Sequence, residues 1–202
     1  KLQVFVNTRL AETFRDFSGE SIEAGSLVAR CERWAGEVPA GVAVLTAGVD
    51  VQADRVEVEV VGWGIGQESW SIAHHKIYGD PESLEGPLWH ELAQLLLVRR
   101  WQHESGAEMR IAASCIDSGY CATQVYGFCR TKWRQRVWAI KGREGDRDIW
   151  PTKWGSTAKA KGLRLKIVGV DAAKSGLFAR LQIEAPGPGF CHFPEGRPAE
   201  YF

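Results

Sequence analysis

The stretch VAVLTAGVDVQADRVEVEVVGWG, from Val42 to Gly64, predicts two adjacent strands of a central sheet. Its first part, the VAVL of residues 42–45, is a continuous apolar run, which is typical of a strand buried on both faces. After a short polar link, valines at positions 56, 58 and 60 alternate with charged residues. This period of two predicts a half-buried strand that forms a hairpin with the first.

Asp50 stands at or just past the end of the first of these strands. A carboxylate at the edge of a rigid sheet can be held firmly as a reactive or metal-binding group. The alternative is structural, because Asp is common in turns, where its side chain accepts hydrogen bonds from nearby backbone N–H groups. The stretch alone leaves both roles open.

The length of 202 residues suits one sizeable domain with a core of its own. The chain begins at Lys1 rather than Met, so we expect it to be a piece of a larger protein. No apolar run approaches the roughly 20 residues that a membrane-spanning helix needs. The five cysteines are odd in number and none has CxxC spacing, which argues against a disulfide framework and a zinc site and favours a reducing cytosol.

The net charge of zero hides a strong asymmetry along the chain. Residues 130–166 carry twelve Lys or Arg against three acids, whereas the first 129 residues carry ten basic and eighteen acidic side chains. This layout indicates a basic face for a polyanion, set on a body that holds an acidic site. A solvated basic loop would explain the same counts.

We expect residues 1–40 to form a linker-like arm packed on a domain that spans residues 41–202. Within that domain the pattern predicts three antiparallel strands, then a helix, a strand, a helix and further strands, which is a mixed α/β order. The remaining elements are expected at residues 69–78 (strand), 87–100 (helix), 109–116 (strand), 123–133 (helix), 136–140 (strand) and 163–170 (strand), with a helix from Asp171.

The strand expected at residues 109–116 also leads to an acid, Asp117. This strand should lie parallel to the first one and beside it, so Asp50 and Asp117 would converge. Two carboxylates at one place repel each other unless a cation lies between them. Oxygen ligands suit Mg²⁺ or Mn²⁺, and two such ions, about 3.5–4 Å apart, can promote hydrolysis of a phosphodiester. The prediction is therefore a ribonuclease-H-like mixed sheet flanked by helices, with a site for two divalent ions.

Several segments in series resemble a known family, the nuclease domain of the GpA-type large terminase subunit of lambda-like tailed phages. The resemblance implies a ribonuclease-H-like fold and a metal-dependent endonuclease that cuts concatemeric viral DNA in the host cytoplasm. It is carried by LTAGVDVQADRVEVEVVGWGIGQESW, IDSGYCATQVYGFCR, IKGREG, VGVDAAKSGLFARL and GPGFCHFP, and VFVNTRLAETF is similar to the segment that joins the packaging ATPase to the nuclease.

By this resemblance, Asp50 matches the family's first metal-binding aspartate and Asp117 its second, with Mg²⁺ or Mn²⁺ as the cofactor. Gln52 and Asp54 lie in the first motif and are candidates only for supporting these ligands. Lys141 and Arg143 lie in the KG motif. They are candidates for contacting the backbone of double-stranded DNA, which attracts basic side chains irrespective of sequence.

The family's third acid lies in a helix downstream of the HFP motif, and this chain ends at Phe202 before any such segment. We therefore expect the domain to be truncated at its C-terminal end, which leaves the activity of the fragment open. The late acids worth considering are Glu200, which has no motif behind it, and Asp171, which is better interpreted as a helix N-cap.

The chain has no GxxxxGK[ST] signature, so this piece is not expected to hydrolyse ATP. The resemblance implies an ATPase domain in the same parent chain. The resemblance implies that the terminase small subunit and the portal are partners through the full-length protein, and it implies no membrane partner.

Two alternatives stay open alongside the nuclease. The domain could grip DNA without cutting it, through the basic loop, or it could be another ribonuclease-H-like enzyme such as a resolvase or transposase. His74 and His75 are adjacent in a strand and should point to opposite faces. Trp150 and Trp154, in the basic loop, are the candidates for contact between an aromatic ring and DNA.

Overall fold

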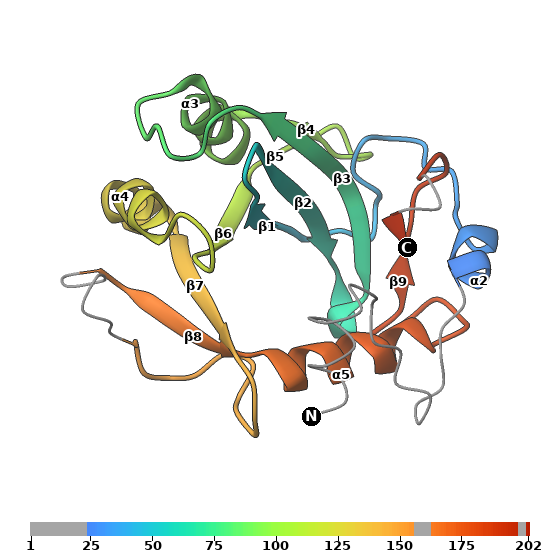
Figure 1. Ribbon diagram of the computed structural model, residues 1–202. Coiled ribbons are helices and arrows are strands. Elements are labelled where there is room, and N and C mark those ends of the chain that lie inside the picture. The colour runs from blue at the N-terminus through green and yellow to red at the C-terminus, as the bar shows by residue number, and fades with distance from the viewer. Residues whose placement is uncertain (1–23, 156–162, 198–200) are drawn as a thin grey trace.

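The computed structural model describes residues 24–155, 163–197 and 201–202. Its centre is a seven-stranded mixed sheet with the strand order β8-β7-β6-β1-β2-β3-β9 (Figure 1). The strands are β1 (Val44–Val51), β2 (Arg55–Trp63), β3 (Ser69–Tyr78), β6 (Ile111–Asp117), β7 (Val137–Arg143), β8 (Leu165–Gly169) and β9 (Cys191–His192), and the helices are α2 (Ala24–Ala29), α3 (Pro87–Ala93), α4 (Ala122–Lys132) and α5 (Val170–Leu181).

The direction of the strands changes in the middle of the sheet. β1, β2 and β3 form an antiparallel meander, whereas β6, β7 and β8 continue from β1 in parallel. A parallel pair requires a crossover connection. α4 connects β6 to β7, and the segment of residues 144–164 connects β7 to β8, whereas α5 follows β8. The predicted α/β class and mixed, ribonuclease-H-like sheet are confirmed.

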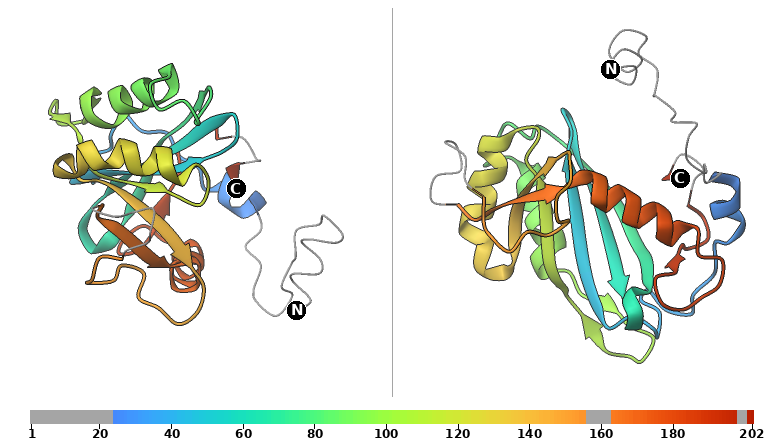
Figure 2. Two further views of the ribbon diagram at one scale, coloured as in Figure 1. Left: turned by 60° about the vertical axis from the view of Figure 1, so that its left-hand side comes forward. Right: turned by 90° about the horizontal axis from the view of Figure 1, so that it is seen from below.

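The helices lie on different faces of this sheet. Figure 1 shows α3 and α4 on one side and α5 on the other, and Figure 2, seen from below, shows α5 lying across the strands. The face under α3 and α4 carries the alternating valines Val56, Val58 and Val60 of β2, which are fully buried. The opposite face is covered by α5 only in part.

The expectation that the first strand is buried on both faces is wrong. Alternate residues of β1 are buried, and the residues between them, among them Gly48 and Asp50, are exposed. The apolar run begins before the strand does, because Val42 is buried in the segment that leads into it. β1 is thus half-buried like β2, and its second face is free for a site.

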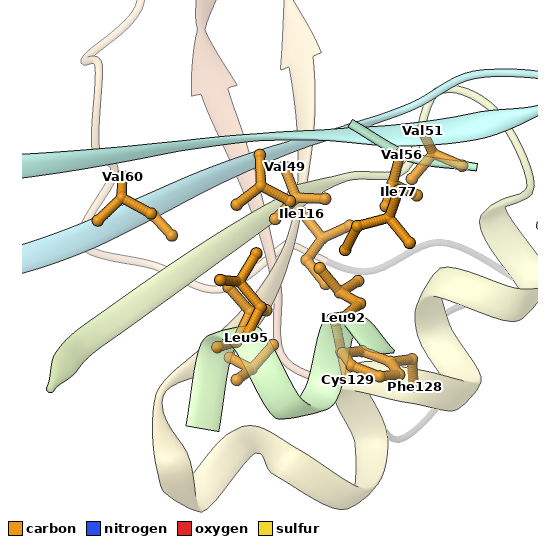
Figure 3. Close-up of a cluster of buried hydrophobic side chains, with 14 of the residues drawn as sticks. Val49, Val51, Val56, Val60, Ile77, Leu92, Leu95, Ile116, Phe128 and Cys129 are labelled. Atoms are coloured by element: carbon orange, nitrogen blue, oxygen red, sulfur yellow. The ribbon is translucent and has the colours of Figure 1, made fainter. Parts of the chain in front are cut away.

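The hydrophobic core lies between the sheet and the helices α3 and α4. In Figure 3 the side chains of Val49, Val56 and Ile116 extend from the strands toward Leu92 and Phe128 on these helices. The indole of Trp89 is also buried here, and its Nε1 donates a hydrogen bond of 3.0 Å to the carbonyl of Pro81. Burial of these side chains holds the two layers together.

Some elements differ from the sequence prediction in their bounds. The helix expected at residues 87–100 is α-helical only to Ala93 and continues as the π-helical turn η2 (Gln94–Val98). A small hairpin of β4 (Trp101–Gln102) and β5 (Glu108–Met109) precedes β6, and it was not predicted. Short 3₁₀ turns complete the structure at η1 (Ile65–Gln67) and η3 (Trp133–Gln135).

The N-terminal arm packs closely on the domain from residue 24 onward. Val38 is fully buried in the core, and its N–H and C=O bond with Gln102 and Glu104. The boundary predicted at residue 41 stays a prediction, and the first 23 residues of the predicted arm lie outside the described residues. Within the described part of the chain, no helix combines the length and apolar character that crossing a membrane requires.

Replacing Leu92 with Ala should destabilise the fold strongly, because Leu92 has no exposed surface and contacts the core beneath the sheet. Removing such a side chain costs about 2–5 kcal/mol of unfolding free energy. Leu177→Ala, at a site that is about half exposed, is the matched control and should cost less than about 1 kcal/mol. Urea unfolding of the parent and both variants checks this, and equal midpoints for all three would contradict the packing described.

Candidate active site

Two neighbouring strands place the predicted aspartates on the same face of the sheet. Val49 of β1 pairs with Ile116 of β6, and both side chains are buried under the helices. One residue further along each strand come Asp50 and Asp117, so their side chains lie on the opposite, open face. Adjacent strands are about 4.8 Å apart, which brings the two carboxylates into reach of a shared ion.

Asp50 is exposed near the end of β1. Its Oδ2 accepts a hydrogen bond from Nε2 of Gln52, which is the kind of support predicted for that residue. Asp54 plays no such part, because its Oδ1 is engaged by Nη1 of Arg55 at 2.8 Å. Of the two polar residues in this motif, Gln52 alone is in contact with the candidate ligand.

Asp117 is the last residue of β6, and the residues after it explain the IDSG motif. The Ser118 side chain is held in place, because its Oγ donates to the carbonyl of Ile140 at 2.7 Å and its N–H donates to the same oxygen at 2.9 Å. A Cβ added at Gly119 would lie 2.9 Å from Oδ2 of Asp117. Glycine is therefore required there for the carboxylate to keep its position.

The open face forms a groove with a volume of about 910 Å³. At its floor is Gly48, where an added Cβ would meet no atom within 4 Å. Asp117 itself is not a lining residue, but Ile140, its partner on β7, and Cys115, two residues earlier on β6, are. The groove is lined by Gly48, Val49, Asp50, Glu57, Glu59, His74, Lys76, Cys115, Ile140 and Tyr201.

Glu57 is a groove residue that sequence reasoning missed. It pairs directly with Asp50 across the β1–β2 hairpin, which makes a row of acids from β6 to β2 on the open face. Arg55 Nε donates to its Oε1 at 2.7 Å, and Nε2 of His74 lies 3.3 Å from its Oε2. The hydrogen bond from Arg55 is the main reason why the pKa of Glu57 lies below its ordinary value. The strict alternation of β2 in the sequence could have predicted the position of Glu57 on the open face.

Glu59 is a second acid in the groove, and burial dominates its behaviour. Its Oε1 accepts a 2.5 Å hydrogen bond from Ser71, whereas its Oε2 is buried and has no hydrogen-bond partner among the described residues. Desolvation raises the pKa of Glu59, and the contacts with Ser71, Tyr201 and Arg197 offset this only in part.

The histidines of β3 are divided between the two faces, as their adjacency predicted. His74 lines the groove beside Glu57. His75 lies on the other face near Trp101, at 6.1 Å between ring centroids, and burial lowers its pKa. Only His74 is therefore placed to act in the groove.

Comparison with known proteins agrees with this architecture and these motifs. Residues 1–202 match the model of a family described as "Terminase large subunit gpA, endonuclease domain". The chain belongs to this family. It is 34% identical to the large terminase subunit of Escherichia phage lambda over 202 aligned residues, which cover 96% of this chain and 30% of that protein.

A second curated relative, the large terminase subunit of Enterobacteria phage P21, is 34% identical over 186 residues, 91% of this chain and 28% of that protein. The chain thus spans about a third or less of the curated relatives that it matches. No solved structure matches it. The predicted terminase family and its nuclease domain are confirmed.

The KG motif of this gpA-type domain lies at the end of β7. Lys141 and Arg143 are exposed, and their positions continue the alternation of Val137 and Ala139, which face the helices. Their side chains therefore lie on the face of β7 opposite to Ile140 and the groove. Their contact with DNA stays a prediction. Gly142 between them has a packing role, because a Cβ there would lie 2.6 Å from Cγ2 of Val170.

The prediction that Asp171 caps the last helix is wrong. α5 begins at Val170, and its N-cap residue is Gly169, so no side-chain hydrogen bond caps the helix. Asp171 lies in the first turn, and its Oδ2 instead accepts a 2.7 Å hydrogen bond from the N–H of Gly145. The acid fastens the loop after β7 to α5. Glu200, the other late acid considered, lies outside the described residues.

The GFCHFP motif fastens the C-terminal part of the gpA-type domain to the sheet. It contains β9, which pairs with β3, and His192 stacks on Trp70 with 4.6 Å between ring centroids. The two ring nitrogens of His192 contact Glu32 and Glu68, the latter at 2.8 Å. The motif is thus structural. All five cysteines are free, and Cys115 lies at the groove.

The burial of Glu59 predicts a pH-dependent stability. Its folded pKa is raised, so the contribution of Glu59 to stability is greatest below the ordinary carboxyl pKa of about 4.3 and is lost as the pH rises through the folded value. Glu59→Gln keeps the shape of the side chain without the charge. Relative to the parent, this variant should gain unfolding free energy between pH 4 and pH 8. Chemical denaturation across this range measures the difference, and a difference that is constant or shrinks with rising pH would contradict the burial of the charged form.

Proposed function

We propose that Asp50 and Asp117 hold divalent ions, Mg²⁺ or Mn²⁺, and that the domain cuts DNA by a two-metal mechanism. The substrate would be concatemeric viral double-stranded DNA in the host cytoplasm, cut at the start and end of packaging. The observation that carries the proposal is the pairing of Val49 with Ile116, which puts the two carboxylates side by side on the open face. The family's endonuclease description supports the class of reaction.

The donor set fits such ions. Carboxylate oxygens are the ligands that Mg²⁺ and Mn²⁺ prefer, and the free space above Gly48 leaves room beside Asp50. Among the residues that the structure describes, no group of three or more His, Cys, Asp or Glu side chains is arranged to hold a metal. Two carboxylates are nevertheless enough for Mg²⁺, which usually keeps several waters and takes its remaining ligands from substrate phosphates.

When bound, two ions of this kind supply an activated water and stabilise the leaving oxygen of the phosphodiester. The residues of the protein would hold the metal ligands and the DNA in position. Gln52 orients the Asp50 carboxylate through its hydrogen bond, and Ser118 anchors the loop that follows Asp117. Lys141 and Arg143 would bind the DNA backbone at the exposed end of β7, where phosphate contacts set the register of the duplex.

The wider assembly is part of the proposal. The curated relatives are terminase large subunits, and this chain corresponds to less than a third of each. We propose that the parent chain also carries the packaging ATPase domain, and that the small subunit and the portal are its partners. The domain boundary at residue 41 belongs to the same proposal.

Replacing either aspartate should abolish cleavage. Asp50→Asn and Asp117→Asn keep the size of the side chain but weaken its binding of a divalent ion, so nicking of supercoiled plasmid should fall more than about 100-fold. Loss of a group that only supports a ligand costs about 10- to 100-fold. Asp54→Asn is the matched control, because the Asp54 carboxylate is paired with Arg55, and it should nick like the parent.

The assay is run with Mn²⁺ and with Mg²⁺, and with EDTA as the blank. Equal nicking by the parent and both site variants would sink the assignment of the site. Equal loss in the Asp54 control would show that the effect is not specific to the open face.

A second function, gripping DNA without cutting it, is favoured by a specific observation. Among the described residues no three His, Cys, Asp or Glu side chains are arranged to hold a metal, whereas the basic side chains of β7 are exposed. In this case the domain would bind the DNA backbone through Lys141, Arg143 and their neighbours, and would position the duplex for the motor.

Both functions predict that DNA affinity falls steeply with salt, because each basic side chain on a phosphate releases a counterion. The double variant Lys141→Ala, Arg143→Ala should reduce the slope of log affinity against log salt by about 2. Arg33→Ala, Arg110→Ala, which removes two charges outside the basic stretch, is the control and should leave the slope unchanged. Fluorescence anisotropy with a short duplex in EDTA measures both. An unchanged slope in the first variant would remove these residues from the DNA interface.

A further inference from the structure

Two large aromatic side chains stand out from the loop between β7 and β8. Trp150 is 43% exposed and Trp154 is 40% exposed, although tryptophan is usually well buried. Ile149 beside them is exposed as well. Exposed apolar surface that is gathered in one place marks a site of interaction rather than a part of the core.

A buried cation holds this loop in position from below. Lys166 of β8 is only 3% exposed, and its Nζ donates to the carbonyl of Pro151 and lies 3.4 Å from that of Thr152. The same ammonium lies 4.4 Å from the ring centroid of Trp154 and 5.2 Å from that of Trp150. Throughout the described residues, no carboxylate forms an ion pair with Lys166.

Burying an ammonium group is costly unless its donors and charge are compensated. Here the compensation comes from backbone carbonyls and ring faces of one short segment, so the cation fixes the positions of Trp150 and Trp154 together. The two rings are therefore presented by a rigid support. A surface that is organised before binding loses little conformational entropy when a ligand arrives.

The aromatic ridge, defined as Trp138, Trp150 and Trp154, adjoins the groove. Trp138 lies 5.6 Å from Trp150 and 6.2 Å from Trp154 between ring centroids. It pairs with Cys115 of β6, and Ile140, two residues later on the same face, pairs with Asp117. Because alternate residues of a strand are about 7 Å apart, the ridge begins within one or two nucleotide lengths of the aspartates.

The described part of the sequence stretch that carries the ridge is rich in basic residues. Between residues 130 and 166 it holds ten Lys or Arg and three acids. The Arg164 guanidinium lies 5.6 Å from the Trp154 ring centroid and 4.4 Å from that of Trp133. Basic side chains interleaved with exposed aromatic rings are the pattern that binds single-stranded nucleic acid, with phosphates held by charge and bases stacked on the rings.

We propose that the aromatic ridge binds an unpaired stretch of DNA strand, with bases stacked on Trp150 and Trp154. Base faces are accessible in a single strand but are stacked on one another inside a duplex, so the ridge selects the unpaired form. This inference uses the proposed nuclease function only for its location, beside the aspartates. It assigns to that site a substrate whose strands are separated next to the bond to be cut.

Binding to a labelled 12-nucleotide oligo-dT tests the proposal, with a 12-base-pair duplex as the comparison. The 202-residue chain is titrated in EDTA, so that no cleavage can occur. Trp150→Ala, Trp154→Ala should weaken oligo-dT binding at least about fivefold for each ring removed, and Trp150→Phe, Trp154→Phe should retain most of the affinity. Duplex affinity should change less than about twofold in either variant.

The controls separate stacking from other effects. Ile65→Ala removes an exposed apolar side chain at the turn between β2 and β3 and should bind like the parent, and a thermal melt of the Ala pair checks its fold. Because oligo-dT binding is measured in EDTA, it does not depend on metal or on cleavage, so failure of the nuclease proposal would remain distinguishable from failure of the ridge proposal. The ridge proposal is overturned if the Ala pair binds oligo-dT as tightly as the parent, or if duplex and single strand lose affinity equally.

Discussion

The pairing of β1 with β6 is the constraint on which the candidate site depends. Val49 and Ile116 are paired and buried, so the core fixes the register of these two parallel strands. A shift of one residue in this pairing would expose the apolar side chains of one strand to water, and the free energy of their burial would be lost. The register that keeps these side chains buried also places Asp50 and Asp117 together on the other face of the sheet. Hydrophobic packing therefore positions two groups that would otherwise repel each other.

The one-sided cover of the sheet explains why this face can hold charges. α3 and α4 bury one face completely, whereas α5 covers the other mainly at the far end, where Arg180 lies 5.1 Å from the ring centroid of Trp63. The remaining open part carries Glu57 and Glu59 between the aspartates and β3. The charge of Glu57 is stabilised by Arg55, whereas burial disfavours the charged form of Glu59. The groove results from incomplete cover and a glycine at its floor.

Much of this arrangement could be predicted from the sequence, because local patterns carry it. The alternation of β2, the two acids that end apolar strands and the α/β order predicted the mixed sheet, and the family was identified separately by the resemblance of several motifs in series. The exposure of the second face of β1 could not be predicted, because an apolar run looks the same whether helices cover one face of the strand or both. The alternation of β2 could have placed Glu57 on the face of Asp50, but their direct pairing depends on the hairpin register. The bond of Asp171 to Gly145, rather than to its own helix, is a contact between distant residues that no local pattern predicts.

The most direct test of the central claim is a crystal structure of the chain soaked in Mn²⁺, with anomalous scattering recorded at the manganese edge. The account predicts anomalous density between the carboxylates of Asp50 and Asp117, on the face of the sheet opposite α3 and α4. Density confined to other residues, or carboxylates that point away from each other with no ion between them, would contradict it.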